Sequence, residues 1–111
     1  MPPPRYLSTL ESGELARRAM IALERLESCD LCPRECAVNR LDGETGECRI
    51  GRYANIASVG PHFGEEAPLV GMRGSGTVFM VGCNLNCSFC QNADISQHSL
   101  GREVDPKELA N

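Results

Sequence analysis

The first periodic feature of the chain is a series of apolar residues at helical spacing near the N-terminus. Apolar side chains recur three or four residues apart, at Leu15, Ala19, Leu23 and Leu26. The charged residues of the same stretch fall largely on other faces: Glu14, Arg17, Arg18, Glu24 and Arg25. This pattern predicts a helix over about residues 12–27 with a solvated charged face. The first residues, MPPPRY, with three consecutive prolines, are expected to form an extended, loosely held tail.

A second pattern is the short, continuous apolar run TVFMV, residues 77–81, which lies between Gly76 and Gly82. Its residues favour β structure, and an uninterrupted apolar run is typical of a strand buried on both faces of a parallel sheet. The segment RYANIASVG, residues 52–60, predicts a short strand. The segment 61–76, rich in glycine and proline, predicts a loop.

The last residues carry the start signal of a helix. Asp105 is placed as the N-cap, Pro106 as the first helical residue and Glu108 three residues after the cap. Only three residues follow Glu108. We therefore expect a longer protein, of which these residues form the front part.

Composition excludes several classes of protein. The chain has 111 residues, a net charge of −4 and 41% hydrophobic residues, which fits one small globular domain. The acidic balance argues against a non-specific nucleic-acid binder, since such proteins carry basic patches. The sequence also lacks an apolar run long enough to cross a bilayer and the apolar centre of a secretory signal. We expect a cytoplasmic protein without a membrane or nucleic-acid partner, in which clustered cysteines bind metal rather than form disulfides.

Three of the seven cysteines lie in the stretch VGCNLNCSFCQN, residues 81–92. Cys83, Cys87 and Cys90 directly follow the expected strand, at the edge where parallel α/β folds build their sites. An iron–sulfur cluster used only for electron transfer takes four thiolates, and this run has no fourth cysteine. Because catalytic metal sites keep one position open, the pattern indicates a cluster with an open iron. Buried thiols or a partial zinc site are the less favoured interpretations.

The run CNLNCSFC resembles the C-x3-C-x2-C signature of the radical S-adenosylmethionine enzymes, including the aromatic Phe89 before the last cysteine. More narrowly, the chain from Cys29 onward resembles proteins described as similar to pyruvate formate-lyase activating enzyme, through the phrases CDLCPREC, GECRIG, HFGEEAPLVG and GSGTVFMVG. The resemblance implies an α/β fold: the front part of an incomplete (β/α) radical-SAM barrel, preceded by a helix and a cysteine-rich, loop-dominated metal-binding segment. The implied division is a tail and helix over 1–28, a metal-binding segment over 29–60 and the start of the barrel over 61–111.

The resemblance also implies a mechanism. Cys83, Cys87 and Cys90 would each hold one iron of a 4Fe–4S cluster, and the amino and carboxylate groups of S-adenosylmethionine would chelate the open iron. One electron from the reduced cluster would split the sulfonium into methionine and a 5′-deoxyadenosyl radical that abstracts hydrogen, with Phe89 near the adenine. The implied partners are an electron donor such as flavodoxin or ferredoxin and a glycyl-radical protein as one candidate substrate, with small-molecule substrates equally allowed.

Two parts of the family pattern do not occur in these residues. A complete barrel takes roughly 200 residues or more. The family's Gly-Gly-Glu segment, which helps to hold the methionine part of S-adenosylmethionine, is absent from this sequence. The alternative function is therefore a truncated, non-catalytic metal-binding module that holds zinc or an iron–sulfur cluster.

The other four cysteines form the pattern C-x2-C-x3-C-x11-C in a turn-rich segment: Cys29, Cys32, Cys36 and Cys48. Four thiolates suit a closed tetrahedral zinc site, the first candidate, and they suit a second iron–sulfur cluster by ligand type. Zinc would be structural, whereas a second cluster could pass electrons to the first. The third alternative is that these thiols are unligated or form transient disulfides.

Other candidate residues carry weaker signals. His62, within the phrase HFGEE, is a candidate neighbour of the site, and His98 is expected at the surface. Adjacent carboxylates rarely converge, so the pair 65–66, both glutamates, is expected to be a solvated loop. Gln91 and Asn92 are expected to hydrogen-bond within the cluster loop. The glycines of GMRGSGTV precede a strand rather than a helix, which favours turns over a dinucleotide-binding loop.

Overall fold

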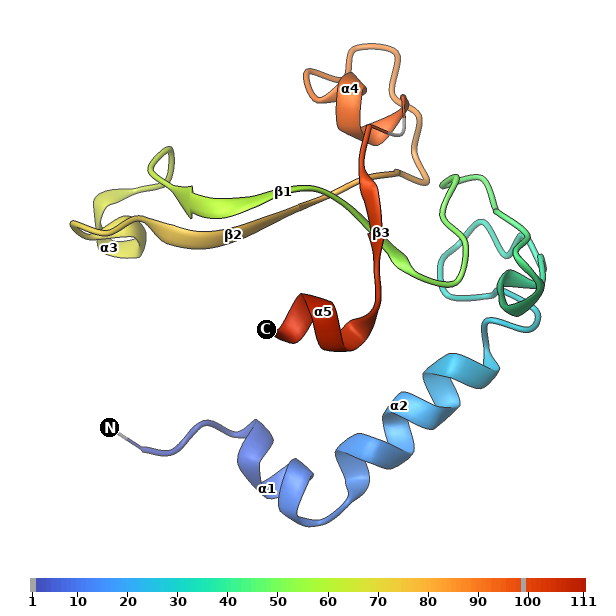
Figure 1. Cartoon of the computed structure of the whole chain (residues 1–111), viewed down its shortest axis with the longest axis horizontal. Helices are drawn as coiled ribbons and strands as arrows, with labels where there is room; N and C mark the ends of the chain where they lie inside the picture. Colours follow the sequence, from blue (N-terminus) through green and yellow to red (C-terminus); the bar gives the residue numbers. More distant parts are fainter. Residues whose placement is uncertain (1, 99) are drawn as a thin grey trace.

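The N-terminal part of the protein is built from two helices rather than one. The structure, a computed structural model, describes residues 2–98 and 100–111. Helix α1 spans Tyr6–Glu11 and helix α2 spans Glu14–Glu24 (Figure 1). Gly13 separates them with a left-handed φ of 75°, a conformation that glycine adopts without steric penalty. The single helix predicted over residues 12–27 is therefore shorter at both ends, and a second helix forms where a tail was expected.

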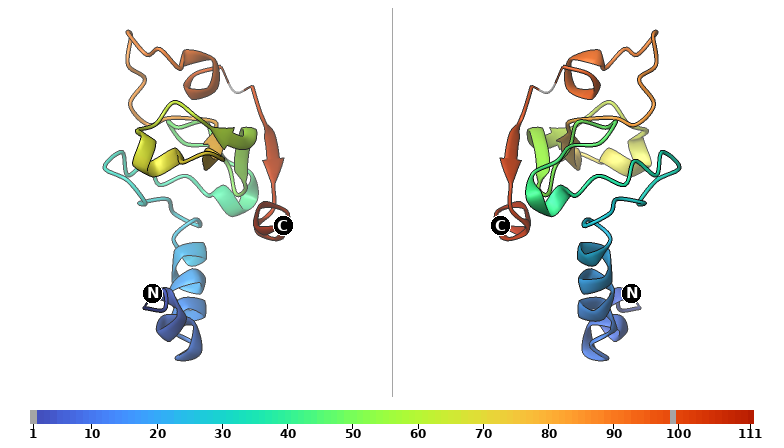
Figure 2. Two further views of the ribbon diagram at one scale, coloured as in Figure 1. Left: turned by 90° about the vertical axis from the view of Figure 1, so that its left-hand side faces the viewer. Right: turned by 90° about the vertical axis from the view of Figure 1, so that its right-hand side faces the viewer.

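Neither α1 nor α2 contains a buried residue. The apolar stripe predicted to face a core is largely open to solvent, with Leu15 41% and Leu23 49% exposed. Figure 2 shows both helices projecting away from the sheet. Just beyond α2, Arg25 pairs with Asp30 of the cysteine-rich segment at 2.7 Å, and Leu26 lines a pocket in that segment.

Irregular backbone dominates the cysteine-rich segment, as the sequence predicts. Its regular element is the 3-10 turn η1, Arg40–Asp42, which is capped by the Asn39 side chain accepting from the backbone N–H groups of Leu41 and Asp42 at 3.1 and 3.4 Å. The Arg40 backbone N–H also donates to the carbonyl of Leu26 at 2.8 Å. This bond ties the segment to the end of the N-terminal helices.

The sheet has three antiparallel strands in the order β2-β1-β3. Strand β1 spans Ala54–His62, β2 spans Ser75–Met80 and β3 spans Arg102–Val104. The antiparallel arrangement contradicts the predicted front part of a (β/α) barrel, whose strands would run parallel. It also corrects the environment of residues 77–81: most of β2 is exposed, and only Val81, just after it, is buried.

The connection between β1 and β2 explains this outcome. Parallel neighbours need a crossover, usually a helix that runs back along the strands. The connection holds only α3, Ala67–Val70. A helix of this length spans about 6 Å, so it cannot carry the chain back along a strand of about 20 Å. The chain therefore turns and forms a hairpin, in which Met80 pairs with Ile56 and Ser75 with His62.

Two short helices complete the described part of the chain. Helix α4, Ala93–Ser96, follows the cysteine loop, and helix α5, Pro106–Ala110, follows β3. The predicted cap of α5 is confirmed, because the Asp105 carboxylate accepts from the backbone N–H groups of Lys107 and Glu108, both at 2.8 Å. None of the helices in the described residues has the length and apolar character needed to cross a membrane.

The core is small and lies where the sheet meets the cysteine-rich segment. Its buried apolar members within the described residues are Cys29, Ile56, Val81 and Val104, and Arg40 is buried with them. Ile56 and Val104 come from β1 and β3, and Cys29 comes from the cysteine-rich segment. The core therefore joins the sheet to the cysteines.

Candidate metal centres

The cysteine loop after β2 is anchored at its start by two backbone hydrogen bonds. Val81 N–H donates to the carbonyl of Asn55 at 2.8 Å, and Gly82 N–H donates to the carbonyl of Ile95 at 2.9 Å. Gly82 has a φ of 89°, which turns the chain sharply before Cys83. The loop therefore begins at a fixed point on the sheet, as predicted, although the sheet is antiparallel.

Each cysteine of the loop, residues 83–90, has a defined local contact, through the thiol at Cys83 and Cys90 and through the backbone carbonyl at Cys87. The Cys83 Sγ accepts from the backbone N–H of Leu85 at 3.4 Å. The Cys87 carbonyl accepts from the Cys90 backbone N–H at 3.3 Å. The Cys90 Sγ lies 3.2 Å from the Ser96 Oγ on α4. All three thiol-bearing residues are half-buried, so they are held in place but accessible to a ligand.

The side chain that holds the middle of the loop was not the one expected. Gln97 Nε2 donates to the carbonyl of Cys87 at 2.8 Å. The side chains of Gln91 and Asn92, for which such bonds were predicted, are exposed. Phe89 is 88% exposed, which leaves its ring free to stack on another aromatic group.

The other four cysteines, Cys29, Cys32, Cys36 and Cys48, form the front set. Backbone hydrogen bonds of the cysteine-rich segment fix the positions of the first two. The Cys29 backbone N–H donates to Val38, and its carbonyl accepts from Ala37, at 3.1 and 3.0 Å. The Cys32 carbonyl accepts from Glu35 N–H at 3.0 Å. Cys29 is buried, whereas the other three front cysteines are half-buried.

A buried arginine, Arg40, lies among three of these thiols and was not anticipated from the sequence. Its Nη2 lies 3.3 Å from the Cys48 Sγ and 3.8 Å from the Cys36 Sγ, and its Nη1 donates to the carbonyl of Ile50. The side chain is only 6% exposed, and its Nε has no partner within the described residues. A sequence signal was available: Arg40 lies between the third and fourth front cysteines.

The guanidinium and the thiols alter each other's acidity. Burial alone would lower the pKa of Arg40, but the hydrogen bonds that its guanidinium donates to the sulfur atoms of Cys29 and Cys48 hold that pKa above its ordinary value. Burial would raise the pKa of the Cys29 thiol, but the Leu31 backbone N–H and the Arg40 guanidinium hold it below its ordinary value. A cation beside thiols favours thiolates, the form in which cysteine binds metal.

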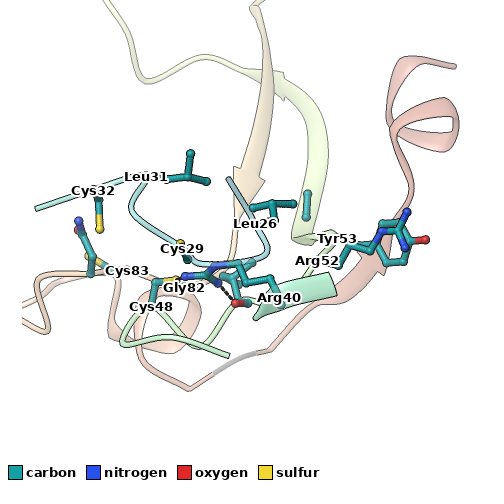
Figure 3. A pocket seen from close by; sticks show the side chains of 14 residues that line it. Leu26, Cys29, Leu31, Cys32, Arg40, Cys48, Arg52, Tyr53, Gly82 and Cys83 are labelled. Carbon is teal, nitrogen blue, oxygen red and sulfur yellow. Dashed lines mark hydrogen bonds between the residues drawn. The ribbon is translucent and has the colours of Figure 1, made fainter. Parts of the chain in front are cut away.

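The two cysteine sets border a common pocket, shown in Figure 3. Its volume is about 500 Å³, and its walls include Cys29, Cys32 and Cys48 of the front set together with Cys83 of the loop. Arg40 also lines it, as do three apolar side chains, Leu26, Leu31 and Ile50. Any group bound at the front set would therefore lie close to the loop.

The donor chemistry suits thiophilic metals, but the thiols are not arranged around a single ion. Among residues 2–98 and 100–111, no three His, Cys, Asp or Glu side chains are grouped so that they could hold one metal ion. A tetrahedral zinc site needs its ligands to converge on one point. In a 4Fe–4S cluster each thiolate binds a different iron, so the sulfur atoms need not converge.

Of the remaining sequence candidates, His62 lies away from the loop. His62 is at the end of β1 that pairs with Ser75, whereas the loop leaves the other end of β2. Its Nδ1 lies 3.7 Å from Glu65, and its ring packs edge-on against Phe79 at 5.8 Å. Glu66 and His98 are exposed.

Comparison with known proteins gives one similarity. The chain is 39% identical to the uncharacterized protein MJ0674 of Methanocaldococcus jannaschii over an alignment of 111 residues, which covers 94% of this chain and 31% of that protein. The chain thus spans about a third of the length of the curated relative that it matches, at 31%. No protein-family model matches the chain. No solved structure matches it either.

Proposed function

We propose that the chain is an iron–sulfur protein of the radical S-adenosylmethionine type. Cys83, Cys87 and Cys90 each bind one iron of a 4Fe–4S cluster, and the fourth iron is left for S-adenosylmethionine. The observation that carries this proposal is the loop itself, in which three thiols follow β2 with the spacing C-x3-C-x2-C. The resemblance of CNLNCSFC to the radical S-adenosylmethionine signature supports it.

Both ends of the loop have contacts that suit a cluster ligand set. Gly82 N–H bonds to Ile95, and the Cys90 thiol contacts Ser96, so α4 holds the loop from both sides. Gln97 fixes the carbonyl of Cys87 between them. Such outer contacts orient metal ligands and tune the metal they bind.

Cys83, Cys87 and Cys90 would hold the cluster, which when reduced would supply one electron for the cleavage of S-adenosylmethionine and so for hydrogen abstraction from a substrate. The chain's own residues bind and orient. The three thiolates hold the irons, and the exposed Phe89 ring offers a stacking surface for the adenine. The partners proposed with this function are a low-potential electron donor such as flavodoxin or ferredoxin and a glycyl-radical protein or small molecule as substrate.

The proposed compartment is the cytoplasm. Seven cysteines are free in the structure, and the reducing cytosol keeps thiols available for metals. The front set is proposed to hold zinc or a second cluster, since its four thiols suit either by ligand type.

A second candidate, a non-catalytic metal-binding module, is favoured by the fold. Radical chemistry needs a site that excludes water. The described residues provide a three-stranded sheet, and the loop cysteines are half-buried. Under this alternative the loop would bind its cluster but S-adenosylmethionine would leave that cluster unchanged.

The experiment is metal and sulfide analysis after anaerobic reconstitution. Wild type is compared with Cys87→Ala and, as a matched control in the other set, Cys36→Ala. We expect Cys87→Ala to lose one cluster's content of iron and sulfide and to keep the metal of the front set. Unchanged iron in Cys87→Ala would show that the loop is not the site, and zinc or iron remaining in that variant identifies the front metal.

A further inference from the structure

The two cysteine sets are joined by two hydrogen bonds between arginine and asparagine residues. Arg34 Nε donates to the backbone carbonyl of Asn84 at 2.7 Å, across 50 positions of the chain. Arg49 Nη1 donates to the Asn86 Oδ1 at 3.0 Å, across 37 positions. Among the hydrogen bonds between side chains, or between side chain and backbone, in the described residues, these two span the longest sequence separations.

Each of these four residues lies beside a cysteine. Arg34 lies between Cys32 and Cys36, and Arg49 directly follows Cys48. Asn84 directly follows Cys83, and Asn86 directly precedes Cys87. The bonds therefore link ligand positions of one set to ligand positions of the other. A shift of the front cysteines would be transmitted to the loop.

The backbone at these contacts is unusual. In the described residues, four residues other than glycine have a positive φ: Glu35, Ala37, Arg49 and Asn86, at 42°, 52°, 63° and 53°. Each is directly bonded to a cysteine of one set or the other, and Arg49 and Asn86 are also hydrogen-bonded to each other. Such conformations persist only where surrounding contacts hold them. The Arg49–Asn86 contact is one of those that hold the loop.

Two further contacts close the interface. A Cβ placed on Gly82 would come within 2.5 Å of the Cys48 carbonyl oxygen and 2.7 Å of the Ile50 side chain. The backbone at Gly82 therefore packs against the front segment with no room for a side chain between them. The Asn84 side chain also hydrogen-bonds the Cys32 thiol.

We propose that Arg34 and Arg49 are positioning residues that clamp the Cys83–Cys90 loop against the cysteine-rich segment and so retain its cluster. This inference rests on the proposed function, because it requires the loop to hold a cluster. The other contacts of the loop are made largely to α4 and the adjoining Gln97, and α4 is a single four-residue turn, while the loop cysteines are half-buried. Metal ligands hold their geometry only when neighbouring residues lock them in place.

The test measures how fast the loop cluster loses iron. The double variant Arg34→Met and Arg49→Met removes both donors but keeps unbranched side chains of similar bulk. The matched control is the double variant Arg18→Met and Arg73→Met, which changes two exposed arginines elsewhere. All proteins are reconstituted anaerobically and mixed with a ferrous chelator. Samples taken over time are reduced with dithionite and frozen, and the loop cluster is followed by its electron paramagnetic resonance signal, which Cys87→Ala identifies by its loss.

We expect the clamp variant to lose the loop signal at least about tenfold faster than wild type and the control to match wild type. Arg49→Lys, which can still donate to Asn86, should be slower to lose it than Arg49→Met. Equal rates in the clamp variant and wild type would overturn the clamp while leaving the proposed cluster intact. A wild type without a loop signal would overturn the proposed function, and the clamp with it.

Folding defects are separated from loss of the clamp by amide hydrogen exchange of the metal-free proteins. The clamp variant should exchange faster in residues 83–90 while residues of β1 and β2 keep wild-type rates. Faster exchange throughout the sheet would show a general loss of structure and would contradict a local clamp.

Discussion

The close approach of the cysteine loop to the front segment predicts a large effect for Gly82→Ala. The new methyl group would lie 2.5 Å from the Cys48 carbonyl oxygen and 2.7 Å from two Ile50 side-chain carbons. Gly82 also has a φ of 89°. The substitution therefore introduces a backbone conformation that alanine disfavours and a steric overlap with backbone that cannot rotate away.

The two penalties can be added approximately. A left-handed backbone costs an L-residue about 1–2 kcal/mol, and forcing an extra methyl group into a packed site costs about 1–3 kcal/mol. Because alanine reduces the conformational entropy of the unfolded chain relative to glycine, the substitution also stabilises the protein by about 0.4–1 kcal/mol. The expected net loss in the free energy of unfolding is therefore about 1–5 kcal/mol, with a central value of about 3 kcal/mol.

The assay is urea unfolding of the metal-free protein, followed by circular dichroism. With an m value of about 1–3 kcal/mol/M, the loss corresponds to a fall in the midpoint on the order of 1–2 M. The matched control is Gly76→Ala, because Gly76 lies in β2 with open space around its Cβ position. The control should be neutral or slightly stabilising. If Gly82→Ala unfolds at the same urea concentration as Gly76→Ala, the loop does not pack against Cys48 and Ile50 as described.

Three further substitutions test local features. Hydrogen bonds from Arg17, and next from Arg18, lower the pKa of Glu14 from 4.5 to about 2, so the stabilising contribution of Glu14 is present above pH 4.5 and is lost as the pH falls toward 2. The helicity measured by circular dichroism should therefore fall over that range in wild type and fall less in Glu14→Gln. The same loss of helicity in both proteins would contradict this. Asp105→Ala removes the cap of α5 and should cost about 1 kcal/mol in urea unfolding, whereas Asp105→Asn should cost less. Ala37 has a φ of 52°, which glycine adopts without strain, so Ala37→Gly should raise the free energy of unfolding of the metal-free chain by up to about 1 kcal/mol. A lower free energy of unfolding would show that Ala37 is not strained.

Structural features that depend on residues close in sequence were predicted correctly. The Asp105 cap and the loop-rich character of the cysteine segment both depend on neighbours in sequence. The interruption at Gly13 was missed, although a glycine beside a helical pattern is a known end signal.

Strand direction was predicted wrongly because the apolar run TVFMV does not encode it. Val78, Phe79 and Met80 are 43%, 38% and 54% exposed, so an uninterrupted apolar run here marks a hairpin strand with little cover. The direction is decided by the connection that contains α3. A short apolar run has the same composition in either arrangement.

The contacts of Arg34 and Arg49 could not be predicted because they join residues that are distant in sequence. Arg34 reaches a residue 50 positions away and Arg49 one 37 positions away. Arg40 is buried among thiols that approach one another only when the segment folds. The cysteine spacing identifies candidate metal ligands, but the arginines that contact these cysteines and the loop can be identified only from the folded structure.

The central claim is that the cluster held by Cys83, Cys87 and Cys90 has one iron available to S-adenosylmethionine. The most direct test uses the Cys36→Ala protein, in which the loop cysteines are intact, after anaerobic reconstitution and reduction. Its electron paramagnetic resonance spectrum is recorded without additions, with S-adenosylmethionine and, as a control, with adenosine. The account predicts that S-adenosylmethionine changes the cluster signal and adenosine does not. A signal that is identical in all three samples would contradict it.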